Sequence, residues 1–594
     1  MGGTGSTQRT ARWTSEGARV FEPKEADGVR ARLLQLNRAC AAYEAMERMA
    51  YFGIAPNLVI YLTEKLYQGT VASANNVTNW IGTLLLTPIL GAYLADAHFG
   101  QFWTFTFAAL VYLLGMVFLT LAVSLHSLKP PTCYFSNPDD CSTLTKHYQI
   151  VIFFLALYII ALGAGGTRPN IQTLGAEQFD VFDSKERARK FSFFNWWTFA
   201  TFCGNLFATT VLIYIQNSVS WSIGYGVPTA GLSIAIAVFL LGTPFYRHKP
   251  PSGSPVVRVA KVLVAAVRTW SFRLPEDPKA LHELHSEQYG QAKRRIDHTS
   301  SLRFLDKAAV NTGSDGQWHV CSVTQVEETK QIIKLLPIFA ATIVPSVMLA
   351  QVLTLFIKQG TTLDRRIGPR FSIPPGSLSG FFMIATIIVI PAYDRGFVPL
   401  LRKYTNNPRG ITMLQRIGLG LFLHILVMVM ASFVEKWRLA SVRSHGLAHQ
   451  KATVPLTVFA LAPQFVLMGV AEVLVEVGKM EFFYDQAPQG MKSLGSSFYT
   501  STLAIGNFMS SLILSTTAKI TREGGRNGWI ENNLNASRLD NYYLFFAVLN
   551  VGNLLFFFVV SRFYVYNREG TSGEKELKHE EEVFPDKEEL GLKN

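Results

Sequence analysis

The stretch AYEAMERMAYFGIAPNLVIYL, residues 42–62, is long and apolar enough to cross a membrane, yet it carries three charged side chains. Glu44, Glu47 and Arg48 are three and four positions apart, which places them on one face of a helix. A charge at the centre of a membrane-spanning helix costs roughly 2.5–3.5 kcal/mol on insertion scales. Three such charges in one span therefore need either mutual pairing or a function.

Two interpretations of this charged cluster remain open. The first is a salt bridge that locks neighbouring helices together. The second is a proton relay, because the protonation of two neighbouring carboxylates responds to each other and to an adjacent guanidinium. We favour the relay.

Similar apolar runs recur along all 594 residues, of which 49% are hydrophobic and 16% charged. The mean hydropathy is +0.21. Soluble domains do not show repeated apolar runs of about 20 residues, so the sequence predicts an all-α integral membrane protein. Twelve membrane-spanning helices are predicted, near 40–63, 73–95, 102–124, 149–175, 192–215, 222–245, 330–358, 376–395, 411–434, 455–483, 492–516 and 541–566.

A long basic segment separates the first six predicted spans from the last six. Six spans, a linker and six spans are typical of the major facilitator fold, in which two six-helix bundles move about a site at the membrane midplane. The predicted divisions are an N-terminal segment (1–38), an N-terminal bundle (39–245), a linker (246–329), a C-terminal bundle (330–566) and a disordered tail (567–594).

The formal net charge of +13 fits this arrangement. Basic loops are retained on the cytoplasmic side of a membrane, which places the linker and, with an even number of spans, both termini in the cytoplasm. No nucleic-acid-binding motif occurs, so no nucleic-acid partner is expected. Residues 256–272 alternate apolar and basic positions at helical period, which predicts a helix lying on the cytoplasmic membrane face or, alternatively, a partner-binding helix.

Two features fall on the opposite side of the membrane in this topology. Cys133 and Cys141 share one polar loop and are the only plausible disulfide pair among the five cysteines. Asn535 begins an Asn-Ala-Ser sequon and is a candidate for glycosylation. No histidine or cysteine cluster has metal-ligand spacing, so no metal site is expected.

Several motifs together resemble one family. Glu44-x-x-Glu47-Arg48 resembles the ExxER signature of proton-coupled oligopeptide transporters, and the turn from Asp96 to Gly100 resembles that family's loop between helices two and three. Gln101 departs from the basic residue that is common at its position. The resemblance extends over nearly the whole chain, is strongest to the plant nitrate and peptide transporters, and includes FFNWW (193–197), TLDRRIG (362–368) and EFFYDQAP (481–488).

The resemblance also implies a charge pair between the two bundles. Arg168, in the fourth span, stands where the family usually has a lysine, which pairs with a glutamate of helix ten and contributes to substrate binding. Glu481 matches that glutamate in the family's EFF motif. We therefore expect Arg168 to pair with Glu481 and, as in peptide-carrying relatives, to meet the substrate's carboxylate. An arginine cannot release a proton, so Arg168 keeps the charge but not the acid–base chemistry of lysine.

Three further positions bear on the substrate and on regulation. Leu349 occupies the position at which one nitrate carrier of the family has a histidine, and it is expected either to line an apolar pocket or only to pack. Tyr51 neighbours the charged positions and is expected either to line the same cavity or to pack. Thr104 matches a regulatory phosphorylation site of one relative, which implies a kinase as a partner.

The tenth predicted span holds more charges than the resemblance explains. Glu472, Glu476 and Lys479 follow each other at helical spacing on one stripe. We expect Glu476 and Lys479 to neutralise each other.

These observations predict a proton-coupled symporter that moves small peptides, in the plasma membrane or the vacuolar membrane. Nitrate, or an organic solute such as a hormone or a specialised metabolite, is the alternative substrate, and a non-transporting sensor that keeps the fold is a third interpretation. No cofactor other than the coupled proton is expected. No constellation of nucleophile, base and orienting residue is apparent, which argues against an enzyme.

Overall fold

The computed structural model of the chain describes residues 23–131, 144–176, 178, 184–243, 246, 253–275, 277, 280–283, 295–310, 318–405, 410–448, 450–488, 491–522 and 528–566. Within these residues almost every element is a helix, as the sequence predicts. Cys133 and Cys141 lie outside the described residues, so the disulfide stays a prediction.

The first half of the chain forms six long helical units, and we call α1 to α7 the N-terminal half. A π-helical turn, η3 (Ala208–Leu212), joins α5 to α6, so these two helices together form the fifth predicted span. The helices are α1 (Pro23–Glu64), α2 (Thr70–Leu94), α3 (Gly100–Ser124), α4 (His147–Ala176), α5 (Ser184–Phe207), α6 (Ile213–Ser218) and α7 (Trp221–Leu241).

The second half repeats this plan with more interruptions, and we call α10 to α18 the C-terminal half. Its helices are α10 (Leu336–Ala341), α11 (Ile343–Val352), α12 (Leu355–Gly360), α13 (Ser379–Ala392), α14 (Val398–Thr405), α15 (Met413–Ser444), α16 (Ala462–Gln486), α17 (Lys492–Arg522) and α18 (Leu539–Phe563). Four short strands, β1 (Leu363–Asp364), β2 (Arg366–Ile367), β3 (Phe371–Ser372) and β4 (Val454–Thr457), form two small ladders, β1 with β4 in parallel and β2 with β3 antiparallel.

The seventh predicted span, 330–358, is not one continuous helix. It is divided among α9 (Val323–Lys334), α10, α11 and α12. Pro337 and Pro345 fall near the starts of α10 and α11, and a proline has no N–H to donate to the preceding turn. The tenth predicted span also begins later than expected, because residues 454–457 pair as β4 with β1.

The helices match a membrane protein in length and composition. Ten helical segments of the described residues are long and apolar enough to cross a membrane, and one of them, Thr70–Ser124, contains both α2 and α3. The charges in α1 lower its mean hydropathy, so that α1 is not among these ten. With α1 included and α2 and α3 counted separately, the spans equal the twelve that the sequence predicts.

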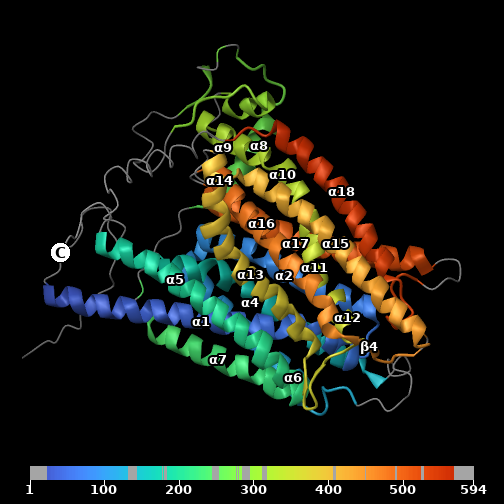
Figure 1. Ribbon diagram of the computed structural model, residues 1–594. Helices are drawn as coiled ribbons and strands as arrows, with labels where there is room; N and C mark the ends of the chain where they lie inside the picture. Colours follow the sequence, from blue (N-terminus) through green and yellow to red (C-terminus); the bar gives the residue numbers. More distant parts are fainter. Residues whose placement is uncertain are drawn as a thin grey trace, which may run out of the picture.

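The two halves meet along α2 and α17 and, through shorter contacts, at one end of the bundle, which we call the β4 end. Figure 1 shows α6, α12 and β4 together there, with α8 and α9 at the opposite end, the linker end. At the β4 end Lys358 donates to Thr63 across the halves at 3.0 Å, and the backbone N–H of Thr70 donates to the Asn532 side chain at 3.0 Å. Of the helix pairs that join the two halves, only α2 and α17 pack against each other along much of their length.

The linker has a small core of its own. α8 (Pro255–Arg268) confirms the predicted helix, and its buried face, with Val262 and Ala265, packs with Leu305 and Ala308 of a 3-10 helix. Val267 on the other face is 71% exposed. Whether that face lies on a membrane or binds a partner stays a prediction.

Candidate functional site

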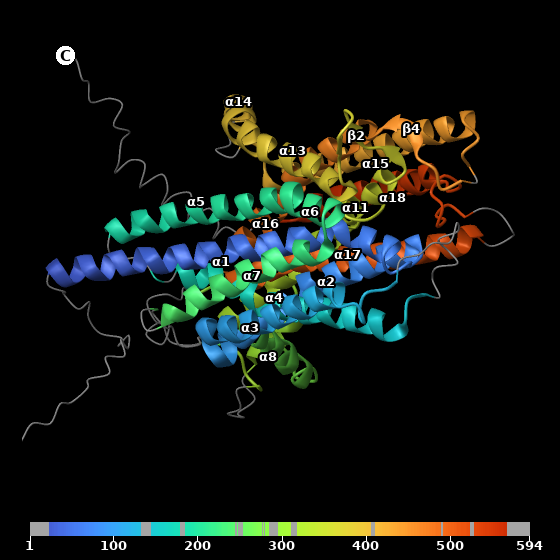
Figure 2. The ribbon, with the colours of Figure 1, turned by 90° about the horizontal axis from the view of Figure 1, so that it is seen from below.

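α1 holds the charged cluster near its middle, with α5 and α7 packed on either side (Figure 2). As the spacing predicts, Arg48 Nε donates to Glu44 Oε1 at 2.7 Å and lies 3.7 Å from Glu47 Oε2. The side chains of Glu44 and Glu47 are 3% and 1% exposed, whereas that of Arg48 is 28% exposed. The cluster therefore faces the protein interior, with the guanidinium of Arg48 at its open edge.

Arg168 completes this cluster from α4. Its Nε and Nη2 both donate to Glu47 Oε1, at 3.0 and 2.8 Å. Its guanidinium also lies over the ring of Tyr51, 4.7 Å from the centroid, in a cation–π contact. Arg168 is thus held by two residues of α1.

The predicted pair between Arg168 and Glu481 is wrong in this structure. Glu481 lies on α16 with its side chain 36% exposed, and its nearest basic group is Arg416 Nη1 at 3.7 Å. The Arg416 guanidinium lies over the ring of Tyr393, 4.2 Å from its centroid. The cation of α4 is therefore neutralised within the N-terminal half and not across the two halves.

Glycines let α4, which carries Arg168, pack closely against α2 and α3. A Cβ built on Gly91 of α2 would lie 2.0 Å from the carbonyl oxygen of Gly165, and one built on Gly163 would lie 2.5 Å from the backbone of Tyr112. Larger side chains at these positions would push these helices apart.

One oxygen of the cluster has no hydrogen-bond partner among the described residues. Glu47 Oε2 is buried, and its closest cation, Arg48 Nε, is 3.7 Å away. The buried hydroxyl of Tyr112 makes no well-formed hydrogen bond there, but it lies close enough to Glu47 to act on its carboxylate. A buried carboxylate oxygen without a well-formed hydrogen bond is costly, so the cluster is incompletely satisfied.

A second charged cluster lies in the C-terminal half. Lys479 Nζ is 2.5 Å from Glu476 Oε1 and also donates to Ser346 and Thr502, at 3.1 and 3.3 Å. This confirms the predicted pairing of Glu476 with Lys479. Tyr499 of α17 interacts electrostatically with Glu476 and with Arg48, so the two clusters face each other across the halves.

Sequence reasoning missed His424 as a member of this second cluster. His424 Nε2 lies 3.1 Å from Glu472 Oε1, and both side chains are buried. The sequence did contain a signal, because an ionisable residue within the apolar run LFLHILVMVM (421–430) is rare without a function.

Two predicted modification sites are buried. The Asn535 amide donates to the carbonyls of Gln450 and Ala452 at 3.0 and 2.9 Å, and its oxygen accepts from Arg438 at 2.8 Å. A glycan on this nitrogen has no room, so the glycosylation prediction is wrong for the folded chain. Thr104 is 8% exposed within α3, which does not fit a kinase site.

Tyr51 and Leu349 are the two remaining residues of the predicted substrate site. Tyr51 is buried against Arg168 and stacks on Trp80, with ring centroids 6.1 Å apart, so it belongs to the charged cluster. Leu349 is partly buried and packs against the apolar core of the C-terminal half, which agrees with the packing alternative.

His298, Asp306 and Glu327 of the linker could together offer ligands to a metal ion, which the sequence did not predict. The buried ammonium of Lys330 already lies 2.6 Å from Asp306 and 2.7 Å from Glu327. Since a cation occupies the position between these carboxylates, we interpret the group as an ion-pair network that holds the linker core together.

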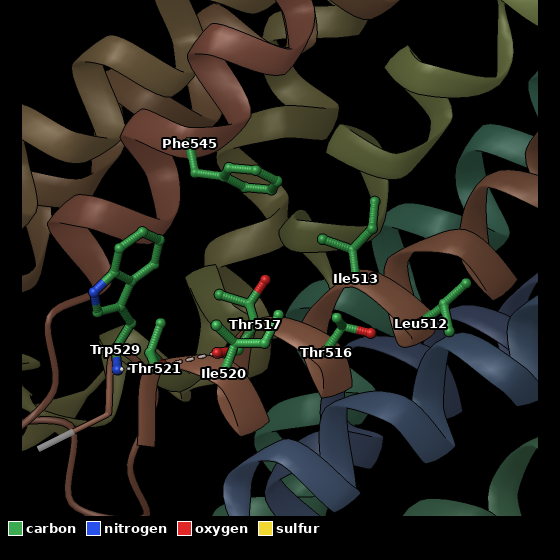
Figure 3. A pocket seen from close by; sticks show the side chains of 8 residues that line it. All are labelled: Leu512, Ile513, Thr516, Thr517, Ile520, Thr521, Trp529 and Phe545. Carbon is green, nitrogen blue, oxygen red and sulfur yellow. Dashed lines mark hydrogen bonds between the residues drawn. The ribbon is translucent and has the colours of Figure 1, made fainter. Parts of the chain in front are cut away.

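A pocket of about 390 Å³ lies between α17 and α18, away from both charged clusters (Figure 3). Its wall is formed by apolar and threonine side chains, among them Leu512, Ile520 and Phe545, which are 65%, 62% and 39% exposed. Exposed apolar side chains on a membrane-spanning helix contact lipid. We therefore do not place the transport site there.

Comparison with known protein families identifies relatives. A model of the PTR2 type, described as the POT family, matches residues 102–530. Protein NRT1/ PTR FAMILY 5.2 of Arabidopsis thaliana is 56% identical over 539 residues, which cover 90% of this chain and 92% of the relative. Protein NRT1/ PTR FAMILY 5.3 of the same plant is 55% identical over 551 residues, covering 92% and 94%.

Solved structures support the same fold. An auto-inhibited POT family peptide transporter superposes with a TM-score of 0.63 at 21% identity, covering 90% of this chain and 98% of that one. The POT family transporter PepTSo superposes with a TM-score of 0.64 at 19% identity, covering 89% and 97%. At such identities the likeness concerns the fold, which is the twelve-helix major facilitator fold.

Proposed function

The chain belongs to the POT family of integral membrane transporters, and on that premise we propose that it is a proton-coupled symporter of small peptides. The observation that carries the proposal is the chain of charges from Glu44 through Arg48 and Glu47 to Arg168, in which both carboxylates are buried and one oxygen of Glu47 has no hydrogen bond among the described residues. Intramembrane acids paired in this incomplete way mark ion pathways.

The chemistry of the cluster explains how a proton and a solute are linked. A proton on Glu47 Oε2 removes the negative charge that holds Arg168, so the guanidinium becomes free to bind the carboxylate of a solute. A solute carboxylate that reaches Arg168 first in turn favours protonation of Glu47. Each ligand therefore raises the affinity for the other, which is the thermodynamic requirement for coupling.

The contacts between the halves indicate which side is open. The halves are joined at the β4 end by Lys358 with Thr63 and by Asn532 with Thr70. Arg48 is partly exposed between them. If the basic linker and both termini are cytoplasmic, as we infer from the positive charge of the linker, this is the inward-facing state of an alternating-access cycle.

A peptide offers a carboxylate and an ammonium group, and the two clusters offer the complementary charges. Arg48 and Arg168 supply cations from the N-terminal half, and Glu476 supplies an acid from the C-terminal half, whose oxygens are buried beside Lys479. The packed position of Leu349 leaves no histidine for an anion at that place. POT transporters have been solved with a thioalcohol-conjugated peptide and with 5-aminolevulinic acid, which also carries an amino group and a carboxylate.

Nitrate or an organic acid remains the second candidate solute, since the relatives carry the name NRT1/PTR. Such a solute would bind Arg48 or Arg168 without engaging Glu476. A plasma or vacuolar membrane location belongs to the same proposal.

Uptake in cells that express the chain tests the proposal. We expect inward currents and acid uptake with a panel of dipeptides, and Glu47→Gln should abolish proton-driven accumulation while solute exchange across the membrane persists. Glu64→Gln, at the exposed end of the same helix, is the matched control and should behave as the unmodified chain. Accumulation by Glu47→Gln at the unmodified level would reject the mechanism, and large nitrate currents without a peptide response would reverse the choice of solute.

A further inference from the structure

His424 is the least expected charged group of the membrane-spanning region. It lies in the middle of α15, its side chain is fully buried, and both ring nitrogens have partners. Nδ1 is 2.9 Å from the carbonyl oxygen of Gly420, and Nε2 is 3.1 Å from Glu472 Oε1. A histidine inside an apolar helix is tolerated only when such partners satisfy it.

The geometry fixes how many protons this pair holds. A carbonyl oxygen only accepts, so Nδ1 must carry a hydrogen. The contact between Nε2 and Glu472 Oε1 then needs one further proton, either on the imidazole or on the carboxyl group. Without it, a lone pair on nitrogen would face a lone pair on oxygen at 3.1 Å in a buried site. The observed arrangement therefore holds one shared proton.

This pair is connected to the rest of the second cluster. Glu472 interacts with Glu476 of α16, which pairs with Lys479, and with Tyr499 of α17. Tyr499 also interacts with Arg48 of α1. The sequences of α10, α11 and α13 contain no charged residue. Arg416 and Glu435, on α15, lie two and three turns from His424. In α18 the titratable and charged residues lie close to its two ends.

We propose that His424 and Glu472 form a second proton-holding site, in the C-terminal half, with His424 as the positioning residue. This inference rests on the proposed symport. Loss of the shared proton to water changes the charge of the pair from zero to minus one and drives the Glu472 carboxylate away from Nε2. Glu472 Oε2 has no hydrogen bond among the described residues, so the carboxylate is free to turn towards the cation Lys479. Lys479 then loosens its hold on Glu476, which frees that carboxylate for the ammonium group of the solute.

Glu472→Gln separates this role from a structural one. The amide N–H of glutamine donates to Nε2 as a protonated Glu472 would, so the helices should stay packed while the exchangeable proton is gone. His424→Gln should act similarly, because glutamine can donate to Glu472 but cannot carry a mobile proton. His445, exposed at the end of the same helix, provides the control variant His445→Gln.

Two measurements decide the matter. The first is the melting temperature of the purified chain in detergent, followed from about pH 5 to about pH 9. A pair that holds one shared proton adds its own pH dependence to the stability of the fold, which the unmodified chain and His445→Gln should show and Glu472→Gln should have lost. The second is the accumulation ratio of the transported dipeptide at a fixed inward pH gradient. A coupled proton contributes about tenfold per pH unit, so Glu472→Gln should accumulate about tenfold less at a gradient of one unit.

The outcomes separate the two proposals. An identical pH dependence of melting in the unmodified chain and in Glu472→Gln would overturn the proton-holding site. An altered melting profile with an unchanged accumulation ratio would overturn its part in coupling. If the unmodified chain accumulates no dipeptide, the proposed function has failed, and the melting profile still decides whether the pair holds a proton.

Discussion

Two buried arginines, Arg168 in the N-terminal half and Arg438 in the C-terminal half, are bound by their surroundings in different ways. Arg438 donates to both carboxylate oxygens of Glu435 at 2.8 and 2.6 Å, to the Asn535 side chain at 2.8 Å and to the Leu534 carbonyl at 2.7 Å. Arg168 donates from two nitrogens to a single oxygen of Glu47. The other oxygen of Glu47 is left without a hydrogen bond among the described residues.

This difference separates a structural charge pair from a working one. Every nitrogen of Arg438 is bound, and Glu435 also accepts from Gln359 at 2.6 Å, so no proton or solute is needed. The Arg168 cluster lacks one donor among the described residues, which is what the proposed uptake of a proton and release of the cation require. The Arg438 pair is fully buried and Arg168 is 11% exposed, but the larger difference between the two sites is the degree of hydrogen-bond satisfaction.

The largest effect is expected when the fully hydrogen-bonded Arg438 site loses its cation. Arg438→Leu leaves the Glu435 carboxylate buried without its cation, which typically costs about 3–5 kcal/mol. We expect little folded protein at the membrane, measured by size-exclusion chromatography of a fluorescent fusion. Arg366→Leu is the control, since Arg366 is 76% exposed and paired only with Asp364, and it should fold normally. Normal folding of Arg438→Leu would show that hydrogen-bond satisfaction does not mark the structural site.

A smaller effect is expected when Asn535, an uncharged residue of the Arg438 site, is substituted. Asn535→Ala removes the acceptor of Arg438 and leaves the carbonyls of Gln450 and Ala452 without their donor. The loss should be about 1–3 kcal/mol, seen as a lower melting temperature with transport retained by the folded fraction. Treatment of the unmodified chain with a glycosidase should not change its electrophoretic mobility at this site, and a mobility shift that Asn535→Ala abolishes would contradict the buried position of the amide.

The smallest effect is expected at the working site. Arg168→Lys keeps the cation opposite Glu47 but gives up the double contact with one oxygen, so the chain should fold and transport with a KM raised by about tenfold, or about 1.4 kcal/mol. The same exchange at Arg438 should cost folding, because lysine cannot reach four partners in a plane. Equal behaviour of the two lysine variants in a folding assay and an uptake assay would remove the distinction between the sites.

Much of the fold was predictable from the sequence, because a membrane imposes a length and an apolar composition on every helix that crosses it. The twelve spans and the shared helical face of Glu44, Glu47 and Arg48 follow from local spacing. The broken seventh span was less predictable, since an apolar composition does not reveal how Pro337 and Pro345 divide a helix. Glu476 and Lys479 lie about one helical turn apart, so their pairing was also predictable from local spacing.

Which charged residues pair between different helices was decided by the tertiary structure. Glu47 and Arg168 are 121 residues apart, and the contacts of Gly91 and Gly163 set how closely and at which rotation α4 packs in the N-terminal half. The resemblance assigned Arg168 to Glu481, but helix rotation turned Glu481 towards Arg416 and Glu472 towards His424. The sequence by itself thus determined which charges lie within membrane-spanning helices. Which charges meet depends on distances between helices, and these are fixed only when all the helices are packed.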